Sequence, residues 1–282
     1  MGSRIRSLSH GEWARVIGLG IPGTLSFAFL IYVGAFAAAP AAPDLDARHC
    51  PRHTAPAEAV LVMIDATDAF SPSQVATFKK VFAGVLRDAV PTEFVSVAEI
   101  RALPAHFIVG LCSPDRGAQP VYSYLLLHPY FDWHRMRASW QREFDRPMAE
   151  AAAELPFYQV WPKSPIIQSI DDATRRLGDV WLHAKHRRLI IFSDMMENTV
   201  AYSDYRERLV PLSFADARVS IPYIRDAAPM LKNTDVSVYY RLVPHDGRHQ
   251  EGAERRTHEV FWHDFFAAHG GRVGVFSVLP FN

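Results

Sequence analysis

The stretch Val60-Leu61-Val62-Met63-Ile64-Asp65-Ala66-Thr67-Asp68 decides the fold class of this 282-residue chain. A short, uninterrupted apolar run predicts a strand that is buried on both faces, as in a parallel sheet covered by helices. A second run, Leu189-Ile190-Ile191-Phe192-Ser193-Asp194, repeats the pattern of a strand that ends in an acid. The two runs predict an open α/β sheet with carboxylates at the edge where such sheets bind ligands.

The remaining segments predict a doubly wound, mostly parallel sheet of about six strands. A short connection containing Pro104 joins the strands expected at 93–100 and 106–112. It is too short for a crossover, so these two strands should be antiparallel neighbours at an edge. Ser71-Pro72 and Ser164-Pro165 each indicate a helix start, with Ser71 as an N-cap. Further strands are expected at 188–193, 236–242 and 273–279, and further helices at 133–153, 216–230 and 255–269.

Composition excludes some functions. The chain has 30 Lys plus Arg and 30 Asp plus Glu, so its formal net charge is zero and nucleic acid is not an expected partner. It has no glycine-rich phosphate-binding loop before a helix. Its histidines, including His183 with His186 and the group from His258 to His269, lack the cysteines or acids of a zinc site.

The N-terminus predicts a membrane anchor. Residues 1–15 are basic, and residues 16–39 form an apolar segment within a charge-free stretch that exceeds the roughly 20 residues of a spanning helix. The positive-inside rule places residues 1–15 in the cytoplasm and the body of the protein in the periplasm, with the chain crossing the inner membrane once. A cleaved signal peptide is the alternative, because small residues follow at 37–42. Residues 40–57, rich in Pro and Ala, are interpreted as a linker, and residues 58–282 as the exported domain.

The chain has two cysteines, Cys50 in the linker and Cys112 at the end of a predicted strand. Export to an oxidising compartment favours a disulfide between them. Two separate thiols, one of them buried, remain the alternative.

Four oxygen-bearing side chains should converge at one edge of the predicted sheet. Asp65 and Thr67 follow the first strand, Asp194 follows the fourth, and Ser164 precedes a helix. The first and fourth strands of a doubly wound sheet lie side by side where the strand order reverses. Two carboxylates and two hydroxyls suit Mg²⁺, Ca²⁺ or Mn²⁺ better than zinc.

This arrangement resembles the von Willebrand factor A domain, also called the integrin I-like domain. The metal-ion-dependent adhesion site of that family has the pattern Asp-x-Ser-x-Ser, a Thr before a helix, and a later Asp. Asp65, Thr67, Ser164 and Asp194 match four of its five positions, and Ala69 stands where the second Ser should be. The resemblance covers residues 58–280 and also implies the antiparallel edge strand.

Because Ala69 has no hydroxyl group, the sequence does not decide whether the site binds a metal ion. Asp68 could compensate, one residue out of the pattern. Otherwise the site is vestigial, and Asp65, Thr67 and Asp194 satisfy backbone donors in turns and helix caps.

The resemblance implies a domain that binds another protein, as part of an envelope complex, through an acidic side chain of the partner at a metal ion. The aromatic segment 113–163 is interpreted as an insertion, either near the binding face or in the core. A purely structural subunit is the first alternative. A phosphatase of the haloacid dehalogenase type, with Asp65 as nucleophile, is less favoured, because Thr67 stands where the general acid should be. We therefore expect binding and no enzymatic activity.

Overall fold

The computed structural model describes residues 44–116, 127–157, 161–204, 212–242 and 253–279. In the segments that begin at residues 127 and 253, side chains are described from residues 134 and 256 onward. The chain divides into two compact units, Met1–Pro43 and Asp44–Asn282. The predicted cytoplasmic N-terminus and membrane segment lie outside the described residues. Among the residues that the structure describes, no helix combines the length and the apolar character needed to cross a bilayer.

The second unit contains one six-stranded sheet with the strand order β3-β2-β1-β4-β5-β6. β3 pairs with β2 in the antiparallel sense, and every other pair is parallel. This order confirms the predicted fold class, the antiparallel edge strand and the side-by-side placement of the first and fourth strands. The strands are β1 (Glu58–Asp65), β2 (Phe94–Ile100), β3 (His106–Cys112), β4 (His186–Ser193), β5 (Thr234–Arg241) and β6 (Gly271–Leu279).

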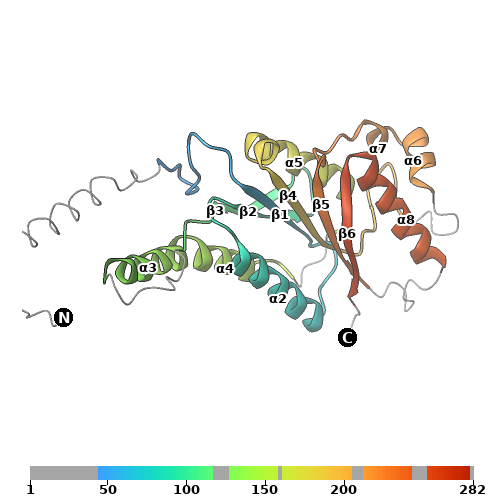
Figure 1. Cartoon of the computed structure of the whole chain (residues 1–282). Helices are drawn as coiled ribbons and strands as arrows, with labels where there is room; N and C mark the ends of the chain where they lie inside the picture. The colour runs from blue at the N-terminus through green and yellow to red at the C-terminus, as the bar shows by residue number, and fades with distance from the viewer. Residues whose placement is uncertain (1–43, 117–126, 158–160, 205–211, 243–252, 280–282) are drawn as a thin grey trace, which may run out of the picture. The chain divides into compact units, whose positions relative to one another are not determined.

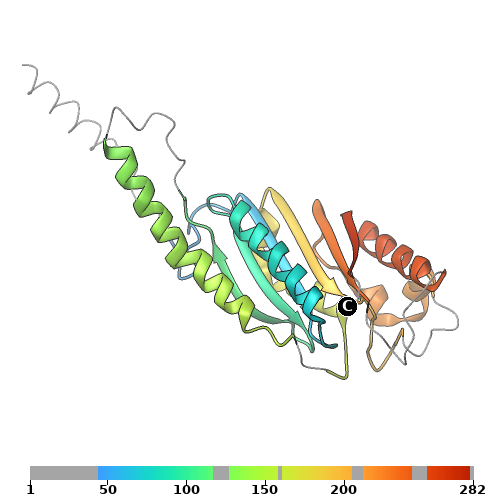
Figure 2. The ribbon, with the colours of Figure 1, turned by 90° about the horizontal axis from the view of Figure 1, so that it is seen from below.

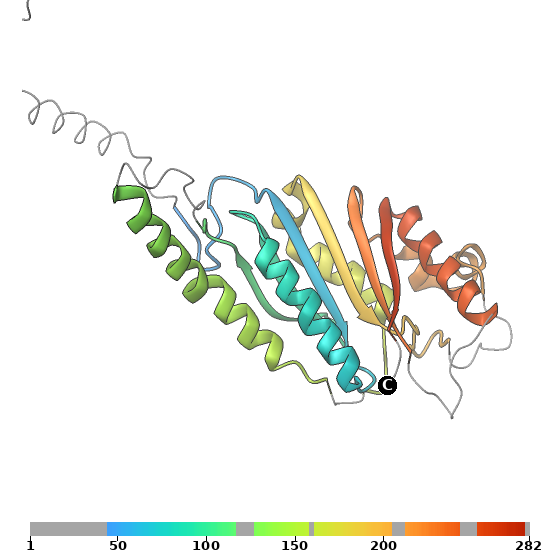
Figure 3. The ribbon, with the colours of Figure 1, turned by 60° about the horizontal axis from the view of Figure 1, so that its bottom comes forward.

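Helices form a layer on each face of the sheet, as Figures 2 and 3 show. One layer consists of α2 and of a long helical run in which α3, η1 and α4 follow one another without a break. The other layer consists of α5, α6, α7 and α8 (Figure 1). Their bounds are α2 (Pro72–Asp88), α3 (Leu127–Trp140), η1 (Gln141–Asp145), α4 (Arg146–Ala153), α5 (Ile166–His183), α6 (Phe214–Ser220), α7 (Pro222–Asp226) and α8 (Ala253–Ala268).

The continuous apolar run of β1 is explained by these two layers. Val60, Val62 and Ile64 pack with the layer of α2 and α4, while Leu61 and Met63 pack with the layer of α5 and α8. Successive side chains point to opposite faces of a strand, so a strand covered twice must be apolar at every position.

Most predicted helices are present with shifted bounds. Ser71 is the N-cap of α2, and its hydroxyl accepts a hydrogen bond from the amide of Gln74, as predicted. The helix expected at 133–153 begins earlier, at Leu127, and contains one π-helical turn, Gln141–Asp145. The helix expected at 216–230 is instead two short helices, α6 and α7, because Pro222 starts a new helix directly after Ser220 and Ile221.

The segment at residues 44–57 joins β1 at the edge of the sheet where the parallel strands begin, which we call the amino edge (Figure 1). The predicted disulfide between Cys50 and Cys112 is present and spans 62 residues. The amide of Cys112 also donates to the carbonyl oxygen of Arg48 at 2.9 Å. These contacts fasten residues 44–57 to the end of β3.

We expect the Cys50→Ser/Cys112→Ser double variant of residues 44–282 to be less stable by about 2–5 kcal/mol, because the open chain gains unfolded-state entropy. Urea denaturation followed by circular dichroism measures this difference. A reducing agent should shift the midpoint of the wild type alone. Equal midpoints for wild type and variant under oxidising conditions would show that the bond does not stabilise the fold.

Candidate functional site

The candidate site is built around the carboxylate of Asp65, which is 1 % exposed at the end of β1. Its Oδ1 accepts hydrogen bonds from the amide and the hydroxyl of Thr67, at 3.0 and 2.6 Å. Its Oδ2 accepts from the hydroxyl of Ser164 at 3.0 Å and from that of Ser193 at 2.7 Å. Three hydroxyl groups from three separate segments therefore meet on one buried acid.

Strand pairing explains this meeting. β1 and β4 run parallel, with Ile64 opposite Phe192, so Asp65 and Ser193 leave the sheet side by side. We call this end of the sheet, where the parallel strands finish, the carboxyl edge. Ser164 reaches it from the loop before α5. The structure thus brings together Asp65, Thr67 and Ser164 as the sequence predicted, and it adds Ser193.

Asp194, the fourth predicted residue, lies directly after β4 and is 3 % exposed. Its Oδ1 accepts a hydrogen bond from the amide of Met196 at 3.0 Å. Burial, and then the nearby charge of Asp194, raise the pKa of Asp65 to about 6, against the hydrogen bonds from Thr67 and Ser193 and the charge of Arg241. Perturbed acids of this kind concentrate at functional sites.

The helix start predicted at Ser164-Pro165 is present. α5 begins at Ile166, and the preceding Pro165 provides no side-chain cap. The Ser164 hydroxyl donates to Asp65. The backbone at the start of α5 is satisfied by Glu197, whose Oε2 accepts from the amide of Ile167 at 2.9 Å.

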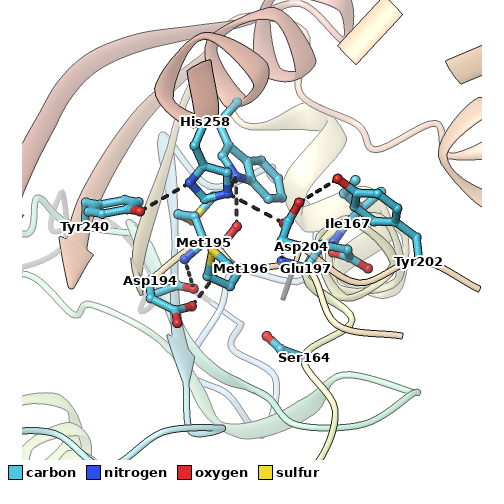
Figure 4. A network of polar contacts seen from close by, with 12 residues as sticks. Ser164, Ile167, Asp194, Met195, Met196, Glu197, Tyr202, Asp204, Tyr240 and His258 are labelled. Carbon is cyan, nitrogen blue, oxygen red and sulfur yellow. Dashed lines mark hydrogen bonds and ion pairs between the residues drawn. The ribbon is translucent and has the colours of Figure 1, made fainter. Parts of the chain in front are cut away.

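Glu197 ties the loop of Ser164 to the loop after β4 (Figure 4). It is 0 % exposed, and its Oε1 accepts from the hydroxyl of Tyr223 at 3.1 Å. Next to it, Ser164 and Asn198 exchange two backbone hydrogen bonds of 2.9 and 2.8 Å. Burial raises the pKa of Glu197 to about 8, and the neighbouring Asp204 adds to this effect, against the hydrogen bonds from Ile167 and Tyr223.

Asp204 extends the network to α8 and β5. Its Oδ2 accepts from the amide of Glu197 at 2.8 Å, and its Oδ1 accepts from the hydroxyl of Tyr202 at 2.6 Å. The Nε2 atom of His258 on α8 lies 3.6 Å from Oδ2 of Asp204, and Nδ1 of His258 lies 3.2 Å from the hydroxyl of Tyr240 (Figure 4). The loop after β4 is therefore bound to three helices: to α5 through Ile167, to α7 through Tyr223 and to α8 through His258.

Arg241, at the end of β5, binds the backbone of the loop between β1 and α2. It is 1 % exposed, and its guanidinium lies 3.5 Å from the ring centroid of Phe70. It donates to the carbonyl oxygens of Asp65, Asp68 and Ala69 at 3.0, 3.0 and 2.9 Å. The positive charge of Arg241 thus lies close to Asp65 and opposes the rise in its pKa.

The donor set suits a hard cation. It comprises the carboxylates of Asp65 and Asp194 and the hydroxyls of Thr67, Ser164 and Ser193. A hydroxyl that donates its proton to Asp65 keeps lone pairs with which it can ligate a metal ion. Among the described residues, no group of three or more His, Cys, Asp or Glu side chains could hold a metal, so any ion here would depend on hydroxyls and water.

A cavity of about 230 Å³ opens beside the cluster. Thr67, Asp68 and Ser164 line its inner part, and Trp161 and Lys163 line its rim. Trp161 is 36 % exposed and stacks with the guanidinium of Arg101 at 5.3 Å. Of the predicted aromatic insertion, Trp161 therefore lies near the site, while Trp140 and Phe144 are buried against the sheet.

Sequence reasoning missed Ser193, Glu197 and Arg241 as site residues. Ser193 interrupts an apolar run at the same edge as Asp194, and Arg241 is a cation at the end of a buried strand. Both positions were visible as polar residues at strand ends. Glu197 carried no comparable signal, since its partners on α5 and α7 are distant in sequence.

Comparison with known proteins gives loose similarities of fold. No protein-family model matches the chain, and a search of curated proteins gives no match. Among solved structures, the SpRpn10 VWA domain is 10% identical, with a TM-score of 0.37, 80% of this chain covered and 89% of that chain. A von Willebrand factor type A protein from Catenulispora acidiphila is 13% identical, with a TM-score of 0.42, 79% of this chain covered and 39% of that chain. At these scores the similarities carry no functional argument, and the fold assignment rests on the strand order.

Replacing Arg241 with Met should destabilise residues 44–282 by about 2–4 kcal/mol, because three buried carbonyl groups lose a charged donor. Lys at this position should restore only part of the loss, since it lacks the planar fork of Arg. Denaturant unfolding checks both variants. The exposed Arg272→Met, which removes a surface ion pair with Asp235, is the control and should change stability by less than about 1 kcal/mol. Equal effects at the two positions would contradict the assigned role.

The raised pKa of Glu197, about 8, predicts a pH dependence of stability. Between pH 4.5 and pH 8 the native state binds this proton more tightly than the unfolded chain, so stability falls as pH rises through that window. Glu197→Gln mimics the neutral carboxyl. It should match the wild type near pH 4, where the carboxyl is protonated in both the native and the unfolded state, and exceed it by on the order of 4 kcal/mol at pH 9.

The measurement is denaturant unfolding of residues 44–282 at a series of pH values. The exposed Glu154→Gln is the matched control and should leave the pH profile unchanged. A Glu197→Gln profile parallel to that of the wild type would show that Glu197 is already ionised at neutral pH.

Proposed function

We propose that this chain is a membrane-anchored, exported domain of von Willebrand A type that binds another protein at its carboxyl edge. One observation carries the proposal: two buried acids, Asp65 and Asp194, end adjacent parallel strands beside an open cavity with an exposed tryptophan on its rim. Buried carboxylates cost stability unless they are paired. Their position in the crevice at the strand ends is where open α/β sheets bind ligands.

Binding is favoured over catalysis by the residue at position 67. A nucleophilic aspartate of the haloacid dehalogenase type needs a nearby acid that protonates the leaving group. Thr67 stands at the position of that general acid, and its hydroxyl donates to Asp65. We therefore propose a non-enzymatic role.

We propose that Asp65, Thr67, Ser164 and Asp194 hold Mg²⁺ weakly, with Asp68 as a further carboxylate at the cavity. The all-oxygen donor set supports this assignment, and Mn²⁺ or Ca²⁺ could replace Mg²⁺. When bound, the ion would supply a positive charge to which an acidic group of the partner could bind.

A structural role with a vestigial site is the second candidate. Ala69 supplies no side-chain oxygen, and its carbonyl oxygen accepts from Arg241. Because this arginine already organises the loop after β1, the fold does not depend on a metal to do so. The two candidates differ in whether partner binding requires a divalent cation.

The anchor and the periplasmic location are proposed from the apolar segment at 16–39 and the basic residues before it. The disulfide between Cys50 and Cys112 supports an oxidising compartment. A periplasm-dependent reporter fused after Asn282 should be active. Activity of a cytoplasm-dependent reporter at the same position would contradict export.

Capture of partners from solubilised membranes tests the binding proposal. Full-length wild type should retain a protein that Asp194→Ala loses by at least tenfold, a difference of about 1.4 kcal/mol. Asp264→Ala, an exposed acid on α8, is the matched control. EDTA should release the same protein, and excess Mg²⁺ should restore it.

The outcomes separate the candidates. Loss with Asp194→Ala but none with EDTA would support a binding surface without a metal. Equal capture by Asp194→Ala, Asp264→Ala and wild type would show that the carboxyl edge is not the binding site.

A further inference from the structure

The amino edge of the sheet, opposite the candidate site, carries a group of cations. Lys185 and His186 lie at the start of β4 and are exposed, and Arg187 follows them at a partly exposed position. Lys232 lies in the turn before β5 and is exposed. We call Lys185, His186, Arg187 and Lys232 the basic cluster.

Strand register shows that the basic cluster is contiguous. Arg187 of β4 lies opposite Ala59 of β1 on one side and Thr234 of β5 on the other. The turns before β4 and β5, with Lys185 and Lys232, therefore emerge next to each other at the same edge. Figure 1 shows this edge at the ends of β1, β4 and β5 away from their arrowheads.

The lysines and the arginine of the basic cluster have no acidic partner within the described part of the chain. The buried Nε atom of Arg187 has no hydrogen-bond partner there, and burial lowers the pKa of Arg187 without an acid to offset it. By contrast, Arg188 pairs with Glu93 at 2.6 Å. Two acids lie near by register: Glu58 is opposite His186, and Asp235 is opposite Arg188 and pairs with Arg272. A surface with unpaired cations is complementary to an anionic partner.

Two further features lie beside the basic cluster. Leu182, at the end of α5, is 44% exposed, and the neighbouring His183 is also exposed. A hollow of about 760 Å³ lies between α5 and the segment at residues 44–57; its lining includes Arg52, His53 and His183 and also the acids Asp46 and Asp179. Exposed basic and apolar side chains together are typical of surfaces that meet a membrane interface.

The chain also joins the domain at this edge. The amide of Lys185 donates to the carbonyl oxygen of Ala57 at 3.2 Å, immediately before β1. The disulfide between Cys50 and Cys112 fixes the preceding residues to the same end of the sheet. The described part of the second unit therefore begins, at Asp44, in a segment that is fastened to the amino edge.

We propose that the basic cluster binds the anionic phosphate headgroups of the membrane in which the chain is anchored. The inference rests on the proposed anchor and commits to lipid headgroups, because an anchor presents them at high effective concentration beside the amino edge. The carboxyl edge lies at the other end of β1, about 25 Å away for a strand of this length. Headgroup binding would therefore direct the candidate site away from the bilayer.

The test uses the full chain in lipid nanodiscs and follows amide hydrogen exchange by mass spectrometry. Discs of phosphatidylcholine are compared with discs that also contain phosphatidylglycerol. Anionic discs should slow exchange about threefold or more in peptides covering 182–188 and 230–234, and high salt should reverse the effect. Glycerol phosphate added to neutral discs should give no protection, which distinguishes lipid from free phosphate.

The variant Lys185→Glu/Arg187→Glu/Lys232→Glu should lose this protection. Lys185→Gln/Lys232→Gln, which changes exposed side chains only, should reduce it and guards against misfolding of the triple variant. The matched control Lys79→Glu/Arg218→Glu/Arg256→Glu alters the same charge at exposed positions elsewhere and should retain it. Equal exchange in neutral and anionic discs, or protection that survives in both cluster variants, would overturn the inference. A chain that does not insert into discs at all would instead refute the anchor.

Discussion

The structure depends on one constraint, which is the burial of the Asp65 carboxylate at the end of a strand covered on both faces. A buried carboxylate must be neutralised or hydrogen-bonded, because its isolated charge is costly away from water. Here the hydroxyls of Thr67, Ser164 and Ser193 donate to it, and Arg241 lies beneath it. These residues come from four different segments, so satisfying one acid fixes how those segments meet.

Two layers of support surround this acid. Arg241 binds the carbonyl groups of the loop that follows β1, and Glu197 joins the Ser164 loop to the loop after β4. Asp204 and His258 connect the second of these loops to α8. Ala69 lacks the side-chain oxygen that would ligate a metal, but the guanidinium of Arg241 binds the carbonyl groups of the same loop and fixes its shape. A metal ion at this edge would therefore add charge to an arrangement that is already organised.

The two ends of the sheet have opposite chemical characters. The carboxyl edge presents buried acids beside a cavity, and the amino edge presents Lys185, Arg187 and Lys232, which have no acidic partner among the described residues. In a parallel sheet every crossover returns the chain to the same edge, so the two sets of turns are kept apart by the length of the strands. The proposed partner site and the proposed headgroup site would thus lie in one domain without competing for one surface.

Local patterns predicted most of the fold, and pairs distant in sequence account for what they missed. The run Val60–Ile64 predicted a strand covered twice, and the short link around Pro104 predicted the antiparallel strand β3. Asp65, Thr67 and Ser164 could be placed together because parallel strand ends share an edge. Glu197 and Arg241 could not be assigned, because their roles depend on tertiary contacts with Ile167 and with the Asp68 carbonyl. The Ser164-Pro165 pair correctly indicated the start of α5, and the hydroxyl of Ser164 donates to Asp65.

The proposed function centres on the Asp65 cluster, and whether this cluster binds a cation separates its two candidate roles. Carbon-13 NMR of the aspartate carboxyl groups in residues 44–282 tests cation binding directly, with the Asp65 signal assigned from Asp65→Asn. Without divalent ions, Asp65 should titrate with a pKa of about 6. Millimolar Mg²⁺ should lower that pKa by at least one pH unit, because a bound cation favours the ionised carboxylate. A titration of Asp65 that is identical with and without Mg²⁺ would contradict the proposed cation binding.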